Sequence, residues 1–463
     1  MSIGAVVMAA GQGTRMKSSL PKVLHPIAGR SLLGWVLDAL GGTRIDHAVV
    51  VVGHGAEAVR EVLPEGCVTA LQREQHGTGH AVQIGLKKLD RSCDTVVVLS
   101  GDTPLLSREL VRSLIRGHRR GGRAATIVSA VLDDPARYGR VVRDGGTVRV
   151  VEARDASPQE LAIREINAGL YVFDRRQLER ALRRVGRDNA QGEMYLPDVL
   201  PLLAGPIGVH VSPDPAVVLG VNSRVELAEC AAIIQARTRH ELMLAGVTMP
   251  DPSSVYVDAD VTVGPDTVLE PGTHLQGRTS IGRRCVIGPD AVIHDCTVGD
   301  GTHVLFAHLS NSAVGDGCQI GPFAYLRPGV VVENGGKVGT YVEVKNTTIG
   351  PNAKVPHLSY IGDADIGAGT NIGAGNITAN YDGFRKHRTF IGAGVKTGSD
   401  CVFVAPVSIG DKAMTAAGSI ITHDVPAGAL GIARARQENQ EDFTRRAEAK
   451  ARAATKRDGK GSR

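Results

Sequence analysis

The sequence has few aromatic residues and no arrangement of cysteines typical of a disulfide or zinc framework. Phe, Tyr and Trp together make up 3% of the residues, with a single Trp. The seven cysteines are scattered, odd in number and without a Cys-x-x-Cys pair, a usage typical of reduced thiols in a cytoplasm. We therefore expect neither structural disulfides nor a zinc cluster.

Long apolar runs are missing as well. No stretch approaches the ~20 apolar residues of a membrane span. The apolar start, Ile3 to Met8, has no basic region before it and leads into glycines, so it is typical of a first strand and not of a signal peptide. The net charge of +5 is concentrated toward the C-terminus, which does not indicate a nucleic-acid surface. These absences predict a cytoplasmic protein that binds neither membrane nor nucleic acid.

The most informative segment is MAAGQGTRMKSSLPK at residues 8–22, which follows directly on this apolar strand. Gly11 and Gly13 leave backbone N–H groups free to approach a phosphate without a side-chain clash. Arg15 and Lys22 add the cations that a polyphosphate needs once it leaves water. Gly-x-Gly alone is usually an ordinary turn, and the string matches neither the P-loop nor the dinucleotide fingerprint. The full string resembles the signature of sugar-1-phosphate nucleotidyltransferases.

From Ile3 to about Asn222, short Val- and Ile-rich strands alternate with helical segments. This rhythm predicts a mostly parallel, doubly wound (Rossmann-like) α/β sheet with a site at the strand ends. Ser223 and Glu226 form a capping box, which opens a helix that Gly246 would close. We predict a first domain over residues 1–222 and a linker helix over 223–250. Strands are expected at 48–52, 95–99, 124–132 and 170–173, and helices at 31–40, 80–89 and 108–119.

Beyond Pro250, aliphatic residues recur every six positions and a glycine often follows them. Neither the helical period of 3.6 nor the strand period of 2 produces this pattern. A coil of short strands with one inward aliphatic on each face does produce it, with rungs ~4.8 Å apart. The pattern predicts a parallel β-helix over 251–437 and matches the hexapeptide-repeat acyltransferases, whose coil is left-handed. The repeating positions are Val263, Leu269, Leu275, Ile281, Ile287, Ile293, Val314, Ile320, Leu326, Val332, Val338, Val344, Ile391, Thr397, Phe403, Ile409, Thr415 and Ile421.

Two stretches depart from the repeat. Residues 380–388, NYDGFRKHR, interrupt it between Ile372 and Ile391. Such an insertion is either a tolerated surface loop or a segment that grips a ligand. The tail at 438–463 is charged and poor in apolar residues, so it cannot bury a core and we expect it to be disordered.

Polar residues follow two more strands of the first domain. Gln72 offers an acceptor and donors to a pyrimidine edge, with backbone groups of Gly77 and Thr78 beside it, although a glutamine on a loop is usually just solvated. Asp102 comes after a strand and directly after Gly101. A carboxylate there suits Mg²⁺, which binds few protein oxygens together with phosphate oxygens. The alternative role for Asp102 is that of a helix N-cap.

His357, in the string KVPHLSYIGD, is the candidate catalytic residue of the coil. An amine that attacks a thioester must lose a proton, and imidazole accepts protons near neutral pH. A lone histidine is more often structural, so the residue by itself leaves both interpretations open.

These motifs resemble, over the whole chain, the family of bifunctional N-acetylglucosamine-1-phosphate uridyltransferases and glucosamine-1-phosphate acetyltransferases. The resemblance extends through YGR at 138–140, VE at 151–152, EINAG at 165–169, AQGE at 190–193 and GVN at 220–222. It implies that Asp102 and Asn222 hold Mg²⁺. It departs at Ser100, where the family often has Tyr, so no aromatic contact is expected there. The implied uridyltransferase site comprises Met8, Ala9, Ala10, Gly11, Lys22, Gln72, Gly77, Thr78, Ser100, Gly101, Asp102, Gly139, Glu152, Asn167 and Asn222.

In the coil, the matching string HLSYIGD implies that His357 is the general base of acetyl transfer. In the family the acetyltransferase sites lie between neighbouring coils of a homotrimer, which makes the 380–388 loop a gripping element. The resemblance assigns sugar-phosphate contacts to Arg327, Lys345, Tyr360, Asn371 and Lys386. It assigns acetyl-CoA contacts to Ala374, Asn380, Tyr381, Ser399, Ala417 and Arg434.

The resemblance implies an enzyme that acetylates glucosamine 1-phosphate with acetyl-CoA. It then transfers UMP from UTP to N-acetylglucosamine 1-phosphate and releases pyrophosphate. This second step needs no protein nucleophile, because positioning and charge neutralisation by Mg²⁺, Arg15 and Lys22 can carry it. Two alternatives are a single-function nucleotidyltransferase whose coil only oligomerises, and a non-catalytic assembly subunit. Both are disfavoured, because the residues expected for both sites are present.

Overall fold

The computed structural model describes residues 2–145 and 147–458. The chain folds into two compact units. The first comprises Met1–Pro265 and Leu269–Thr279, and the second comprises Asp266–Val268 and Ser280–Arg463. These units are groups of residues that pack together and do not define functional domains. The domain boundaries expected at 222, 250 and 437 therefore stay predictions.

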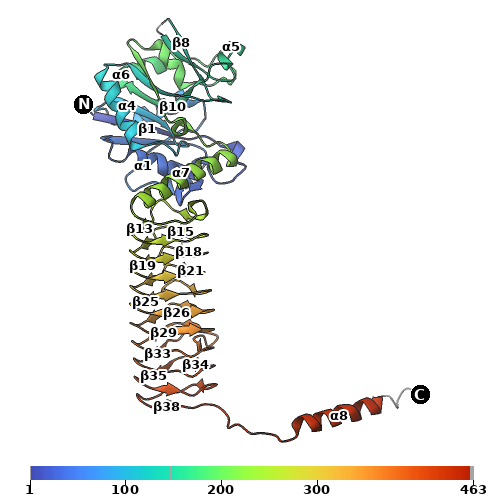
Figure 1. The fold of residues 1–463 in the computed structure, drawn as a ribbon. Helices are drawn as coiled ribbons and strands as arrows, with labels where there is room; N and C mark the ends of the chain where they lie inside the picture. The colour runs from blue at the N-terminus through green and yellow to red at the C-terminus, as the bar shows by residue number, and fades with distance from the viewer. Residues whose placement is uncertain (1, 146, 459–463) are drawn as a thin grey trace. The chain divides into compact units, whose positions relative to one another are not determined.

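Within the described residues, the first unit is built on a nine-stranded mixed sheet with the strand order β11-β7-β10-β6-β1-β4-β5 (Figure 1). Strand β1 runs parallel to both β4 and β6, whereas β10 runs antiparallel to β6 and β7. The hairpin β8–β9 is attached to β10. The strands are β1 (Ser2–Ala9), β4 (His47–Val52), β5 (Val68–Leu71), β6 (Cys93–Ser100), β7 (Ala125–Val131), β8 (Arg140–Asp144), β9 (Thr147–Val151), β10 (Glu165–Asp174) and β11 (Ile207–Val211), with a small hairpin β2 (Pro26–Ile27) and β3 (Arg30–Ser31) outside the sheet.

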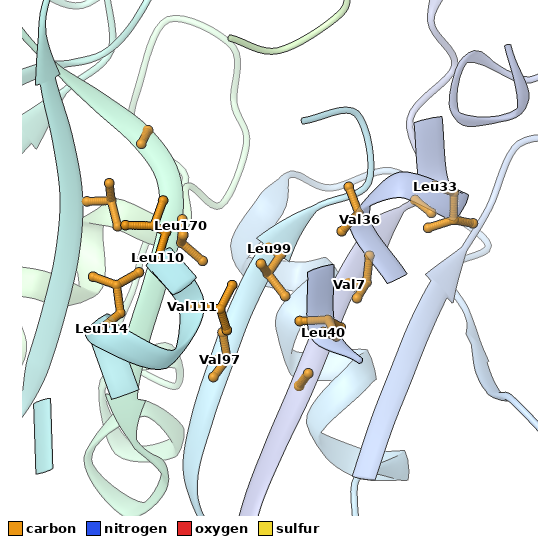
Figure 2. Close-up of a cluster of buried hydrophobic side chains, with 14 of the residues drawn as sticks. Val7, Leu33, Val36, Leu40, Val97, Leu99, Leu110, Val111, Leu114 and Leu170 are labelled. Carbon is orange, nitrogen blue, oxygen red and sulfur yellow. The ribbon is translucent and has the colours of Figure 1, made fainter. Parts of the chain in front are cut away.

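Helices cover both faces of this sheet, because alternate residues of each central strand point to opposite sides. Val7 and Leu99 pack with helices α1 and α4 on one face (Figure 2). Val6 and Val98 pack with α3 and α6 on the other. Each such side chain contributes roughly 1.5–3 kcal/mol when fully buried. The helices of this unit are α1 (Leu32–Leu40), α2 (Ala56–Glu61), α3 (Thr78–Lys88), α4 (Arg108–Arg120), α5 (Pro158–Leu161), α6 (Arg175–Leu182) and α7 (Arg224–Leu244), with short 3₁₀ turns η1 (Thr14–Met16), η2 (Lys22–Leu24), η3 (Leu196–Leu202), η4 (Pro215–Val218) and η5 (Pro252–Ser254).

The strands and helices expected from the sequence are present, and their ends differ by a few residues. The largest difference is β10, which begins at Glu165 instead of 170. Residues 165–167 pair with β7, so the segment that carries the EINAG string belongs to the sheet and is not a loop beside it.

The capping box at the start of α7 is confirmed. The Ser223 hydroxyl accepts the Glu226 backbone N–H, and the Glu226 carboxylate accepts the Ser223 N–H. Such a cap contributes about 1 kcal/mol. Cys230 and Ile234 on this helix are buried in a cluster with Leu32 and other residues of the first unit.

The coil consists of short parallel strands that stack rung upon rung in three sheets (Figure 1). In the second unit these sheets run β18-β21-β24-β27-β30-β32-β34-β37, β16-β19-β22-β25-β28-β31-β33-β35 and β17-β20-β23-β26-β29. The coil strands are β12 (Tyr256–Val257), β13 (Thr262–Val263), β14 (Val268–Leu269), β15 (His274–Gln276), β16 (Ser280–Ile281), β17 (Val286–Ile287), β18 (Val292–His294), β19 (Thr297–Val298), β20 (His303–Val304), β21 (His308–Ser310), β22 (Ala313–Val314), β23 (Gln319–Ile320), β24 (Tyr325–Leu326), β25 (Val331–Val332), β26 (Lys337–Thr340), β27 (Glu343–Lys345), β28 (Thr348–Ile349), β29 (Lys354–His357), β30 (Tyr360–Gly362), β31 (Ala364–Ile366), β32 (Ile377–Ala379), β33 (Thr389–Ile391), β34 (Val402–Val404), β35 (Val407–Ile409), β36 (Met414–Thr415), β37 (Ile420–Ile421) and β38 (Leu430–Gly431).

The six-residue repeat predicts the inside of this coil correctly. The repeating positions are buried, including Thr397, Phe403 and Thr415, with Val263 half-buried. The predicted fold class, an α/β sheet domain followed by a hexapeptide coil, is confirmed.

The tail differs from expectation, because residues Phe443–Asp458 form helix α8. Its sequence is rich in Ala, Arg and Lys, which have high helix propensity. Side chains 443–455 are exposed, so this helix buries no core, in keeping with its composition. None of the helices within 2–145 and 147–458 has both the length and the apolarity needed to cross a membrane.

Candidate active sites

Three polar side chains from distant parts of the sequence meet beyond the carboxyl ends of β1 and β6. Lys22 Nζ forms an ion pair with Asp102 Oδ2 and donates a hydrogen bond of 3.1 Å to Asn222 Oδ1. The side chains of Lys22 and Asp102 are each only 14% exposed. The structure therefore joins the predicted cation and the two predicted metal ligands in one group, here called the Lys22 cluster.

Asp102 is held in place from several sides. Ser100 Oγ donates to its Oδ1 at 2.6 Å, and its backbone carbonyl accepts the Val221 N–H at 2.9 Å. Burial would raise the pKa of Asp102, but the Lys22 ammonium and the Ser100 hydroxyl outweigh burial and lower that pKa. The N-cap alternative is wrong, because Ser107 caps the following helix α4.

The glycine loop leaves room beside this cluster. A side chain at Gly11 would meet no neighbouring atom within 4 Å. Gly13 adopts a left-handed conformation with φ 63°, and a Cβ there would lie 2.6 Å from Lys22 Cβ, so Lys22 depends on a glycine at position 13. Arg15 is exposed on η1, and none of the described residues forms an ion pair with it. The structure thus places Lys22 in the cluster and leaves Arg15 at the surface.

Gln72 is 3% exposed, so the solvated alternative for this residue is wrong. Its Nε2 lies 3.3 Å from the Gly77 carbonyl and 3.2 Å from His80 Nδ1. Gly77 has a φ of 100°, and a Cβ there would lie 2.5 Å from the Met194 carbonyl oxygen. Thr78 Oγ1 accepts the Leu196 N–H at 2.9 Å, which ties this loop to η3.

Three more residues of the expected uridyltransferase site, Gly139, Glu152 and Asn167, lie together. The Asn167 N–H donates to the Gly139 carbonyl at 2.8 Å, and a Cβ at Gly139 would lie 3.4 Å from Glu152 Oε1. Glu152 also lines a cavity of about 370 Å³ with Asp198 and other residues. Burial, and then the charges of Asp198 and Asp155, raise the pKa of Glu152.

Two supporting residues were not identified from the sequence. The Tyr138 hydroxyl accepts the Gly220 N–H at 3.2 Å, and Glu226 Oε2 accepts the Asn222 N–H at 2.7 Å. Together they hold the segment that carries Asn222. The YGR string contains Tyr138 but assigns it no role, and the sequence indicates only a helix-capping role for Glu226.

Two of the predicted phosphate-binding residues of the coil, Arg327 and Lys345, lie at the ends of β24 and β27, and a third, Tyr360, begins β30. Leu326 pairs with Val344, and Val344 pairs with Ile361. The residues that follow them, Arg327 and Lys345, therefore stack one rung apart. Arg327 Nη1 forms an ion pair of 2.9 Å with Glu343.

Asp363 and Lys386 complete this group. Asp363 Oδ2 accepts Asn380 Nδ2 at 2.5 Å and lies 3.9 Å from Lys345 Nζ. The adjacent Lys345 ammonium lowers the pKa of Lys386. Two ammonium groups share one nearby carboxylate, so the group has positive charge to offer an anion. Asp363 ends the matching family string but was not identified as a site residue, because its role depends on the register between rungs.

The 380–388 loop is anchored at its far end. Arg388 donates from Nε and Nη2 to the two carboxylate oxygens of Asp365, both at 2.6 Å. Within the loop, Asp382 Oδ1 accepts the N–H groups of Phe384 and Arg385. Phe384 is 92% exposed, so an anchored loop presents an aromatic side chain to its surroundings.

His357 ends β29 and is exposed. Its carbonyl accepts the Ser359 hydroxyl at 2.7 Å, and none of the described residues hydrogen-bonds its imidazole. Asn371 lies on a different sheet from Arg327 and Lys345, in bridges to Lys354 and Lys396.

The predicted acetyl-CoA residues Ala374, Ser399 and Ala417 lie in successive rungs. The Asp400 N–H donates to the Ala374 carbonyl and the Gly418 N–H to the Ser399 carbonyl, both at 2.8 Å. A Cβ at Gly418 would lie 3.9 Å from Arg434 Cδ. Within one chain, the residues expected for the acetyltransferase site therefore lie in separate groups.

The fold and the two sites define a class, a nucleotidyltransferase joined to a hexapeptide-repeat acyltransferase. The MobA-like NTP transferase domain family matches residues 5–193. The bacterial transferase hexapeptide (six repeats) family matches residues 260–295.

The chain belongs to the family of bifunctional GlmU proteins. The bifunctional protein GlmU of Mycobacterium bovis is 49% identical over 454 residues, covering 95% of this chain and 92% of the relative. That of Streptomyces avermitilis is 49% identical over 451 residues, covering 95% and 94%. That of Kineococcus radiotolerans is 48% identical over 447 residues, covering 95% and 91%. The predicted function is confirmed: the chain is a bifunctional enzyme of UDP-N-acetylglucosamine synthesis with uridyltransferase and acetyltransferase activities.

Proposed function

We propose that Asp102 and Asn222 hold a Mg²⁺ ion in the uridyltransferase site. The carrying observation is that their side-chain oxygens converge on one cation, the Lys22 ammonium. Carboxylate and carboxamide oxygens are hard donors of the kind that Mg²⁺ binds, so the donor set fits the ion. When bound, Mg²⁺ neutralises charge on the phosphates of UTP.

The residues of this chain bind and orient the reactants. The end of β1 at Met8 and Ala9, together with Ala10 and Gly11 of the loop after it, lies beside the phosphates, and Lys22 turns from Asp102 to the phosphate oxygens. Gln72 holds the uracil edge, while Glu152 and Asn167 hold the sugar hydroxyl and acetamido groups. A phosphate oxygen of N-acetylglucosamine 1-phosphate then bonds to the α-phosphorus of UTP as the bond to pyrophosphate breaks. Positioning and charge neutralisation together can carry such a displacement without a protein nucleophile.

In the coil, Arg327, Lys345 and Lys386 bind the phosphate of glucosamine 1-phosphate. The amine nitrogen bonds to the thioester carbonyl carbon of acetyl-CoA, His357 takes the amine proton, and the thiolate of CoA leaves. Acetyl-CoA is held by the groups at Ala374, Asn380, Tyr381, Ser399, Ala417 and Arg434.

A homotrimer would complete this second site. Phe306, Phe323, Tyr341 and Leu358 form an exposed apolar ladder along one corner of the coil, with adjacent ring centroids 5.5 and 5.3 Å apart. All four residues have φ between 42° and 57°, a left-handed conformation that is costly for bulky side chains. Corners of the same kind at Asp295, Asn311 and Asn346 carry the polar residues that tolerate it.

The ladder ends at Leu358, the residue after His357. A second coil that covers the ladder would therefore also cover the exposed imidazole. Burial of the ladder favours association, and the same contact would supply the missing side of the acetyltransferase site. This arrangement explains why one chain holds His357 and Asn371 apart from the lysine group.

The test is a crossed pair of variants in the full chain, assayed for pyrophosphate and CoA separately. Asp102→Ala should abolish pyrophosphate release and leave CoA release near wild type. His357→Ala should reduce CoA release by ~10²–10⁴-fold and spare uridyl transfer to supplied N-acetylglucosamine 1-phosphate. Matched controls are Asp133→Ala, whose side chain is fully exposed, and His423→Ala, an exposed coil histidine. Uridyl transfer within a few-fold of wild type in Asp102→Ala would refute the metal assignment.

A further inference from the structure

A second basic pocket opens at the amino-terminal edge of the first sheet. It has a volume of about 570 Å³ and is lined by Ile3, Gly42, Thr43, Arg44, Arg112, Ile115, Arg116, Arg119 and Arg120. Ile3 is near the start of β1, whereas the Lys22 cluster lies beyond the other end of this strand. Six residues of extended strand separate the two, a distance of about 20 Å. This arginine pocket is therefore not part of the uridyltransferase site.

Four of its five arginines come from one helix. The inner face of α4 carries Leu110, Val111 and Leu114, which are buried against the sheet (Figure 2). The arginines at 112, 116, 119 and 120 are exposed and follow one another at helical spacing along the outer side. Arg44 joins them from the segment after α1.

Four of the five arginine charges are not neutralised by an ion pair with a described residue. The Arg112 guanidinium donates to the uncharged carbonyl of Gly42 at 2.8 Å, whereas Arg119 forms an ion pair of 3.5 Å with Asp94 and also interacts with the carboxylate of Asp46. The three others, Arg44, Arg116 and Arg120, form no ion pair with a described residue. None of the pocket-lining residues carries a carboxylate.

A purely structural explanation accounts for part of this arrangement. Basic residues in the last turn of a helix interact favourably with its dipole, which suits Arg119 and Arg120. Arg112 also has a structural role, because its guanidinium donates to the Gly42 carbonyl. Neither explanation accounts for Arg44, which comes from another segment, or for Arg116, which lies before the last turn of α4. Like charges at i and i+4, as at 112, 116 and 120, destabilise a helix. The cluster thus lowers the stability of the free protein unless an anion binds there.

We propose that the arginine pocket binds a small anion with two or more linked phosphate groups. Guanidinium groups match pairs of phosphate oxygens, and several arginines around one hollow match several phosphates. The volume lies in the range of small-ligand sites, and Ile3 and Ile115 add apolar surface beside the charges. A hollow of this size fits a compact polyphosphate or a nucleotide better than a flat membrane or an extended nucleic acid.

The test measures binding of inorganic tripolyphosphate to the full chain by calorimetry, with UDP-N-acetylglucosamine added to fill the uridyltransferase site. The pocket variant is Arg116→Gln/Arg120→Gln. The matched control is Arg180→Gln/Arg183→Gln, which removes the same charge from exposed positions on and beside α6. Any binding in the coil is common to all three proteins.

We expect the affinity of one class of binding site for tripolyphosphate to fall at least tenfold in the pocket variant. The affinity of this site should stay unchanged in the control variant. Without ligand, the melting temperature of the pocket variant should be no lower than that of wild type. Tripolyphosphate should raise the melting temperature of wild type more than that of the pocket variant. A parallel titration with ATP shows whether the apolar surface contributes to binding. If ATP binds more tightly than tripolyphosphate, the pocket prefers a nucleotide to a simple polyphosphate. Equal binding by pocket variant and wild type would overturn the proposal, as would equal weakening in the control. Displacement by a short DNA duplex that binds more tightly would also overturn it.

Discussion

At the residue scale, the proposed uridyltransferase site lowers the pKa of one carboxylate, Asp102, and raises the pKa of a second one, Glu152. The Lys22 ammonium keeps the pKa of Asp102 low, which preserves the negative charge needed to hold a cation. Glu152 forms no ion pair with a described residue, and burial together with the charge of Asp198 raises its pKa. Burial thus disfavours the ionised form of Glu152. A carboxylate at this position can accept hydrogen bonds from a sugar hydroxyl, so its burial despite this cost is consistent with the proposed binding role.

Glu152→Gln should stabilise the free protein at neutral pH and weaken uridyl transfer. Because the folded pKa of Glu152 lies above its ordinary value of 4.5, the folded state binds more protons than the unfolded state above that pH. Its contribution to stability therefore falls as pH rises from about 4.5 through the folded pKa. The variant should melt higher than wild type at pH 7, and the difference should vanish at pH 4. Glu57→Gln, at an exposed position on α2, is the control. A lower melting temperature at pH 7 would contradict the expected sign.

The sequence was informative about residues whose role depends on local context. The glycine loop, Gln72 and Asp102 each follow a strand, and strand ends were readable from the pattern of Val and Ile. Asp363 and Tyr138 were harder to identify, because each acts on a segment distant in sequence. Asp363 contacts Asn380 across a rung, and Tyr138 contacts Gly220. Such contacts depend on strand register and loop path, which a single sequence does not determine.

At the element scale, the coil is the most predictable part of the molecule. Its six-residue period follows from one inward side chain per flat face, so the sequence alone locates the buried positions. The tail shows the limit of this reasoning. Low apolar content predicted correctly that residues 443–455 bury no core, but α8 forms nonetheless, because helix propensity does not require burial.

Arg388 anchors the far end of the 380–388 loop, so Arg388→Gln should loosen this end and weaken acetyl-CoA binding. The pair with Asp365 is partly exposed, at 35% and 39% for the two side chains, and contributes at most about 1 kcal/mol to global stability. The melting temperature of the coil should therefore change little. Proteolysis at Arg385 or Lys386 should accelerate several-fold, and the KM for acetyl-CoA should rise with uridyl transfer unchanged. Arg278→Gln, outside the loop, is the control. An unchanged KM together with faster proteolysis would separate loop order from cofactor binding and refute the gripping role.

At the whole-molecule scale, the two sites differ in how complete one chain makes them. The residues proposed for the uridyltransferase site all lie in the first unit, and the Lys22 cluster is already assembled. The residues proposed for the acetyltransferase site lie in the second unit as separate groups, with His357 exposed beside the apolar ladder. Residue spacing could not show which of the two sites is complete in one chain, because both sets of residues are scattered along the sequence. The strand register and the exposure of the ladder separate the assembled site from the divided one.

The two activities should therefore respond differently to disruption of the ladder in the full chain. Phe323→Asp/Tyr341→Asp places charges at side chains that are 53% and 60% exposed in one chain, so the fold of the single coil should tolerate both changes. If the ladder is the contact between coils, the variant should sediment as a monomer where wild type sediments as a trimer. CoA release should then fall at least tenfold, because no second coil covers His357, while pyrophosphate release should stay near wild type. Val331→Asp, on the outer side of another sheet and 39% exposed, serves as the matched control. A monomeric variant with full acetyltransferase activity would refute the shared site, and a variant that remains trimeric would move the interface to another face of the coil.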